Sequence, residues 1–173
     1  MLPNETNLIK DPPALILDLM RATFGDRFNA YFLGSPTMIP EATYPCCIVQ
    51  FQTSNNTVTG APTGHDSVSE LITIHFLENS KDNENATDSE DTSIRKIYDY
   101  VQGRDPSTGW YRSDTALYAL RTNLDLTTRA TGYRNVIDHD IDTNYNVTPR
   151  QSMPTIIEAV ITVVTRERIP VNR

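Results

Sequence analysis

Two segments with the alternating pattern of a β-strand, Val68–Leu77 and Thr155–Thr165, constrain the fold of this chain most. Alternation places Val68, Glu70, Ile72, Ile74 and Phe76 on one face of the first segment. The second segment is β-branched almost throughout, which predicts a central or well-covered strand. A short apolar run, Cys46–Phe51, opens after Tyr44-Pro45 and predicts a third, buried strand.

A first helix is expected near the N-terminus. Asp11 precedes Pro12 and Pro13, a favourable start because aspartate caps the first turn and proline is tolerated there. Apolar residues then recur at helical spacing as far as Phe32. We therefore expect a helix of about 20 residues, interrupted or bent at Gly25 and ended by Gly34-Ser35-Pro36.

Two further helices follow from the same kind of pattern. The sequence predicts a helix over Ser89–Gln102, since Gly103 directly follows it and glycine is common just after the end of a helix. Its expected apolar stripe consists of Ile94, Ile97, Tyr98 and Val101. A shorter helix is expected over Leu117–Arg121, capped by Ser113 or Asp114.

Long polar stretches separate these elements. They are Thr53–Asp66, Asn79–Asp88 and Asp105–Pro149. Residues 79–88 are almost free of apolar groups, which predicts a solvated polar loop. Within the last stretch, Asn123–Thr131 is a candidate strand and Val136–Tyr145 is ambiguous. The predicted fold is α+β, an antiparallel or mixed β-sheet with helices packed on one face and long polar loops. All 173 residues fit a single domain 1–173, with 1–10 as a flexible N-terminal arm.

Charge is distributed unevenly along the chain, whose net charge is −7. Asp66–Asp91 holds eight acids against Lys81 alone, whereas Arg104–Arg134 holds five arginines against three aspartates. Twelve of the fifteen basic residues are arginine, which forms bidentate ion pairs at interfaces. The overall acidity disfavours tight, general binding to nucleic acids.

The N-terminal residues and the two cysteines lead to expectations about localisation and about the redox state of the thiols. The first residues have neither a basic nor an apolar signal-peptide region, and no apolar run approaches the roughly 20 residues of a membrane span. We therefore expect a soluble protein made in the cytosol. Cys46 and Cys47 are adjacent, so on a strand they face opposite sides, and reduced, buried thiols are expected.

Few residues in the sequence suggest a catalytic or metal-binding site. Asp138, Asp140 and Asp142 begin like a calcium loop, but Thr143 stands where glycine is needed and Pro149 where the bidentate glutamate belongs. An acidic surface hairpin is the favoured interpretation. No nucleophile elbow or phosphate-binding glycine loop is present in the sequence. We expect no enzymatic activity, no catalytic residues, no cofactor and no metal.

An aromatic–arginine cluster is the remaining candidate. Trp110, Tyr111 and Tyr118 lie close in sequence to Arg112 and Arg121. Such residues anchor binding surfaces, or they form a minor core behind the second helix. The minor core is slightly favoured.

The order of elements resembles the tail terminator (tail completion) proteins in the neck of tailed bacteriophages. The resemblance rests on the first helix, the Tyr44–Val49 strand, the long hairpin into Val68–Leu77, the second helix and the closing β-branched strand. It covers most of the chain but no invariant residue, and the stretch from Asp105 to Pro149 exceeds the minimal pattern.

The resemblance implies a homo-hexameric ring in the virion, assembled in the host cytoplasm. Such a ring caps the tail tube protein, stops its polymerisation and joins the tail to the head–tail connector or neck proteins. Family members carry no catalytic residues. DNA passes through the lumen without specific binding, which an acidic surface favours.

Paired acidic and arginine-rich segments suit head-to-tail contacts that close into a ring. The hypothetical subunit-interface residues are Arg112, Arg121, Arg129 and Arg134 on one side and Glu84, Asp88 and Asp91 on the other. Alternative functions are another neck or tail component, such as a head–tail connector or a tube protein, and a cytosolic domain that binds a small ligand.

Overall fold

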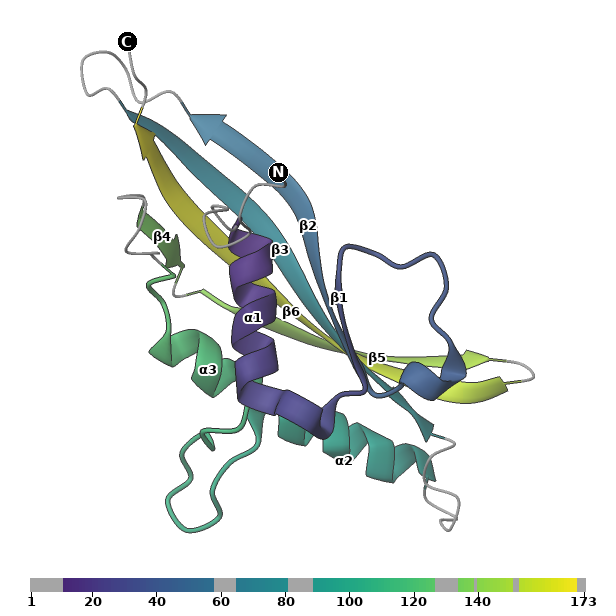
Figure 1. The fold of residues 1–173 in the computed structure, drawn as a ribbon. Coiled ribbons are helices and arrows are strands. Elements are labelled where there is room, and N and C mark those ends of the chain that lie inside the picture. Colours follow the sequence, from purple (N-terminus) through teal and green to yellow (C-terminus); the bar gives the residue numbers. More distant parts are fainter. Residues whose placement is uncertain are drawn as a thin grey trace, which may run out of the picture.

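The computed structural model describes residues 11–57, 65–80, 89–126, 134–138, 140–150 and 153–170 (Figure 1). Its elements are α1 (Pro12–Phe24), β1 (Ala30–Leu33), β2 (Cys46–Thr57), β3 (His65–Asn79), α2 (Ser89–Gln102), α3 (Ala116–Thr122), β4 (Arg134–Ile137), β5 (Asp142–Arg150) and β6 (Met153–Pro170). The fold is α+β: a mixed, curled six-stranded sheet, resembling half a barrel, with three helices packed against it. The predicted fold class is confirmed.

The sheet has the order β1-β2-β3-β6-β4, and β5 pairs with β6 on the same margin as β4. Among the described strands, β1 and β2 are the only parallel pair, and the other pairs are antiparallel. The expected strand over Thr155–Thr165 is confirmed as central, since it forms most of β6, which pairs with three strands. The long strands β2, β3 and β6 extend beyond the helices as an arm (Figure 1).

The first helix is shorter than predicted. Asp11 does cap it, because its side chain accepts a hydrogen bond from the Ala14 amide. The helix ends at Phe24, however, and Gly25 adopts φ +53° with its amide bonded to the Arg21 carbonyl. Glycine adopts this positive φ at little cost, so the chain leaves the helix there. Of the apolar residues that follow, Phe28 comes directly after a 3₁₀ turn (Gly25–Arg27), and Tyr31 and Phe32 belong to β1.

One core fills the space between the helices and the sheet. Its buried members include Ile16 and Met20 of α1, Phe76 of β3 and Ile161 of β6. The predicted bounds of α2 are confirmed, but its buried stripe is narrower than expected. Ile97 and Val101 are buried, whereas Ile94 and Tyr98 are exposed. Tyr98 instead stacks on Tyr145 of β5, with ring centroids 6.0 Å apart.

A second, smaller core lies on the other face of the sheet. It consists of Tyr44, Cys46, Ile48 and Ile156. Cys47 belongs to the main core, so the two adjacent thiols face opposite sides as predicted. Both are free and buried.

The polar stretches are more structured than the sequence predicts. Thr53–Thr57 belong to β2 and pair with residues 67–71 of β3. His65 and Asp66 belong to β3 and pair with Pro170 and Ile169 of β6. Asn79 and Ser80 are buried, and residues 81–88 lie outside the described part.

The middle of the chain differs from the predictions in two details. Thr115, rather than Ser113 or Asp114, precedes α3 as its N-cap residue. Within the described residues of Asn123–Thr131, Asp125 forms one isolated bridge to Val136, and residues 127–131 lie outside that part. None of the helices in the described ranges is long and apolar enough to cross a membrane. The proposed arm 1–10 also lies outside these ranges.

Candidate interaction surface around Trp110

A tight hairpin between α2 and α3 carries Trp110. Arg104 and Tyr111 form an isolated antiparallel bridge, and the Asp105 amide donates to the Trp110 carbonyl at 2.8 Å. The Asp105 carboxylate accepts hydrogen bonds from the amides of Ser107 (2.8 Å) and Thr108 (3.0 Å), and also from the Ser107 hydroxyl. These bonds, led by the Ser107 hydroxyl, hold the pKa of Asp105 below its usual value. The tip therefore has a defined conformation.

The hairpin and α3 together form an open pocket of about 470 Å³. Its lining residues are Arg104, Gly109, Trp110, Tyr111 and Tyr118. The Trp110 side chain is 78% exposed and Tyr118 is 39% exposed. The minor-core interpretation is therefore wrong for Trp110, although Tyr111 packs against the main core. We call this the Trp110 pocket.

Two arginines flank the Tyr111 ring. The Cζ atom of Arg104 lies 5.5 Å from the ring centroid and that of Arg121 lies 5.4 Å from it. These distances are typical of cation–π contacts. Both residues are exposed, and no carboxylate of the described residues is within ion-pair distance of either guanidinium. Arg104 lines the Trp110 pocket and Arg121 packs over the ring of the lining residue Tyr111, so two cations available to an anion lie beside the apolar walls.

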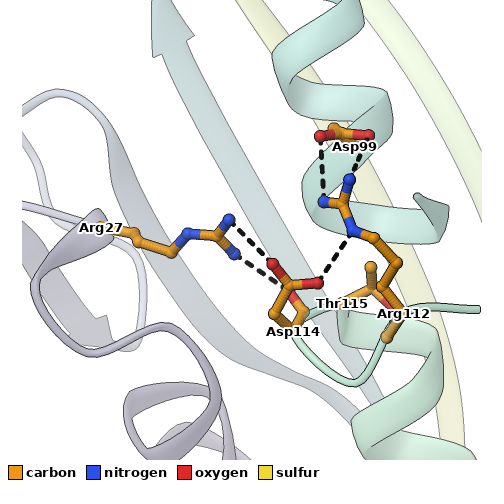
Figure 2. Close-up of polar contacts among 5 residues, drawn as sticks. All are labelled: Arg27, Asp99, Arg112, Asp114 and Thr115. Carbon is orange, nitrogen blue, oxygen red and sulfur yellow. Dashed lines mark hydrogen bonds and ion pairs between the residues drawn. The ribbon is translucent and has the colours of Figure 1, made fainter. Parts of the chain in front are cut away.

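An ion-pair network fixes the hairpin to the body (Figure 2). Arg112 binds Asp99 of α2 through Nη2–Oδ2 (2.9 Å) and Nη1–Oδ1 (3.3 Å), and its Nε donates to Asp114 at 3.0 Å. Asp114 also forms an ion pair with Arg27, with Nη2 and Oδ2 2.9 Å apart. This pair links the network to the 3₁₀ turn that follows α1. The pairs to Asp99 and Asp114 raise the pKa of Arg112, so it stays charged. The network holds the Trp110 pocket in place.

The predicted interface residues fall into three groups. Among the described side chains, Arg112 forms ion pairs within its own chain, whereas Arg121 packs over the Tyr111 ring. Arg134 and Asp91 lie in β4 and α2, but their side chains are outside the described part. Arg129, Glu84 and Asp88 are entirely outside it. The structure thus tests none of the intermolecular contacts, which stay predictions.

Arg104 is the pocket residue that the sequence did not indicate. It is separated from Tyr111 by the whole turn, and only the hairpin brings the two together. The turn residues Asp105, Pro106 and Gly109 are the signal that could have identified this pairing.

A second candidate surface is the outer edge of β2 from Gln50 to Thr57, which we call the β2 edge. The parallel strand β1 pairs only with Cys46–Val49. Among the described strands, β3 alone pairs with β2 beyond Val49. The β2 edge contains no charged residue and no proline, two of the features that natural proteins use to block edge pairing. A third such feature, a bulge or irregularity, is present, because the register of β2 with β3 shifts between Phe51 and Thr53.

The opposite margin of the sheet offers a corresponding surface. Among the described strands, β5 pairs with β6 alone. Its residues 142–146 are all exposed, and we call their outer side the β5 edge. Since β3 and β6 lie between them, the β2 and β5 edges are on opposite margins of one sheet.

The acidic segment Asp138–Asp142 forms no cation site in the described residues. Asp138 accepts hydrogen bonds from Arg166 at 3.1 Å and 2.8 Å, and His139 lies outside the described part. No group of three or more His, Cys, Asp or Glu side chains that could hold a metal occurs among the described residues.

No protein-family model matches the sequence, and no curated protein matches it. The candidate surfaces are therefore interpreted from their own geometry and chemistry.

Proposed function

We propose that this chain is a structural virion protein that forms a ring at the head-proximal end of a phage tail tube. The ring ends tube polymerisation and joins the tail to the head–tail connector or neck proteins. The observation that carries this proposal is the uncharged β2 edge, which no described strand covers beyond Val49. Such an edge is a template for pairing with another chain.

The positions of the two edges favour a ring. If the β2 edge of one subunit pairs with the β5 edge of the next, each contact joins two different surfaces. Contacts of this heterologous type generate closed rings or open helices, according to the rotation between subunits. A hexamer is the proposed closed form. The net charge of −7 is consistent with a lumen through which DNA slides without adhering.

The assembly is tested by native mass spectrometry of the full chain, alone and with tube protein. We expect a discrete ring, and a monomer that persists with tube protein present would overturn the proposal. Lysines at the exposed positions Thr53 and Asn55 of the β2 edge are expected to prevent ring formation. The matched control places lysines at Ser35 and Thr37, which are exposed but lie outside the strands.

The role in the virion is tested by electron microscopy of particles that lack this protein. Overlong tails without heads are expected if the ring stops tube growth. Tails of normal length would instead favour a head–tail connector. A chain that polymerises into tubes by itself would favour the tube protein, because a terminator stops at a ring.

A further inference from the structure

We infer that the Trp110 pocket binds the acidic segment 82–91 of a second copy of this chain. The inference names a contact within the proposed ring and therefore rests on the proposed function. It starts from the composition of the pocket, since Trp, Tyr and Arg are the residues that most often dominate binding energy at protein interfaces. Its volume of about 470 Å³ is sufficient for several side chains.

The two arginines favour an anionic occupant. The Cζ atoms of both guanidinium groups lie close to the Tyr111 ring centroid, at 5.5 Å and 5.4 Å. A guanidinium group carries five N–H donors in a fork that matches a carboxylate. Within the described residues no carboxylate pairs with either arginine. The pocket is complementary to a segment that carries several acids.

The chain itself supplies such a segment. Residues 82–91 hold five acids and no basic residue; the acids are Asp82, Glu84, Asp88, Glu90 and Asp91. No other stretch of ten residues in the sequence holds as many acids. Phosphate groups of nucleic acids are the competing anions, but they are disfavoured by the net charge of −7.

In the sequence, α2 separates the acidic segment from the pocket. The segment leads into Ser89, where the helix begins, and the pocket residues follow Gly103, where it ends. A helix of 14 residues is roughly 21 Å long at 1.5 Å per residue. We place the contact between copies, where it joins two different surfaces as a ring requires.

Trp110 is the only tryptophan, so its fluorescence reports on this pocket directly. The experiment titrates a synthetic peptide of residues 79–91 into the full chain. We expect a saturable change in Trp110 emission that weakens as salt is added. The same peptide with every Asp and Glu changed to Asn and Gln is expected to bind at least tenfold more weakly. An equal response to both peptides, or none at millimolar peptide, would overturn the inference.

Variants of the full chain complete the test. The double variant Arg104→Glu and Arg121→Glu is expected to lose the peptide response, and circular dichroism checks that it is folded. Arg21→Glu is the matched control, because Arg21 also lies over a tyrosine ring at the end of a helix. A response to a single-stranded oligonucleotide but not to the peptide would also contradict the inference.

Self-association gives an independent readout. Asp88→Arg with Asp91→Arg should weaken assembly, and combining it with the Arg104→Glu and Arg121→Glu variant should restore it. Failure of this rescue would overturn the inference. A ring that forms normally in every pocket variant would also reject the pocket contact, yet it would leave the proposed function standing.

Discussion

Arg112 and Asp99 form a two-pronged ion pair that joins the Trp110 hairpin to the last turns of α2. The Nη2–Oδ2 and Nη1–Oδ1 distances are 2.9 Å and 3.3 Å (Figure 2). The Arg112 amide also donates to the Gly103 carbonyl at 3.0 Å. The hairpin is therefore fixed at its base by both side chain and backbone, which leaves its tip free to present Trp110.

Replacing Arg112 by leucine should loosen the hairpin. We expect the free energy of unfolding to fall by about 1 kcal/mol, because two partly solvated ion pairs are lost. Urea unfolding measures this change, and the fluorescence anisotropy of Trp110 should fall as the indole gains freedom. Arg166→Leu is the control, since its pair with Asp138 is more exposed and should contribute less. Unchanged anisotropy in Arg112→Leu would contradict the prediction that the Arg112 ion pairs restrict the motion of the hairpin.

Gly103→Ala should also disturb the contact between the end of α2 and the base of the Trp110 hairpin, in this case through the backbone. A Cβ atom at this position would lie 2.7 Å from the Asp99 carbonyl oxygen and 2.8 Å from its Oδ1. Either the end of α2 or the Asp99–Arg112 pair must then move, at a cost of about 1–3 kcal/mol. Urea unfolding measures the loss. In the control Gly34→Ala, a Cβ would meet nothing within 4 Å, so only the strain of φ +85° is added there.

The sequence predicted the elements whose signals are local. The alternation in Val68–Leu77 identified β3, and Gly103 marked the end of α2. It did not predict β1, because the spacing of apolar residues from Phe24 to Phe32 fits a helix equally well. The pairing of β1 with β2 is a tertiary contact that overrides this pattern. The polar ends of β2 and β3 were also missed, since neither carries the apolar alternation of a half-buried strand.

The candidate site was predicted only in part. Trp110, Tyr111, Tyr118 and Arg121 were recognised as a cluster. The structure brings the three aromatic residues together around one pocket and packs Arg121 over the Tyr111 ring. Arg112 was expected to face a neighbour, but Asp99 and Asp114 already bind it. A sequence shows which residues carry charge, whereas the partner of each charge depends on how α2 and the hairpin pack.

The two thiols should be inert in the folded protein. Burial raises the pKa of Cys46 to about 12 and raises that of Cys47 further. Since the thiolate is the reactive form, neither residue should react with a thiol reagent at pH 8. Both should react once the chain is unfolded in urea, and a colorimetric thiol assay measures the difference. Rapid labelling of the native protein would show that the strands open at Cys46 and Cys47.

Glu70 should reduce stability at neutral pH. Burial, and then the charges of Glu167 and Asp11, raise the pKa of Glu70 in the folded state. The folded chain therefore holds this proton more tightly than the unfolded chain. The charged carboxylate therefore lowers the stability of the fold once the pH rises above 4.5, the pKa of Glu70 in the unfolded chain. Glu70→Gln should stabilise the protein at pH 7 by less than about 1 kcal/mol, and by less still at pH 4. Oε2 of Glu70 is buried and has no hydrogen-bond partner among the described residues, but the side chain as a whole is only half-buried. Urea unfolding at both pH values measures the gain.

Glu158 should have the opposite effect and increase stability at neutral pH. Its carboxylate lies 2.7 Å from His75 Nδ1, and this hydrogen bond lowers the pKa of Glu158 in the folded state. The stabilisation is present above the unfolded value of 4.5 and is lost as pH falls through the lower folded value. Glu158→Gln should therefore cost about 1 kcal/mol at pH 7. The cost should shrink in acid, where the wild-type carboxyl is itself protonated. Urea unfolding between pH 3 and pH 7 tests this, and a cost independent of pH would show that packing, rather than charge, is responsible.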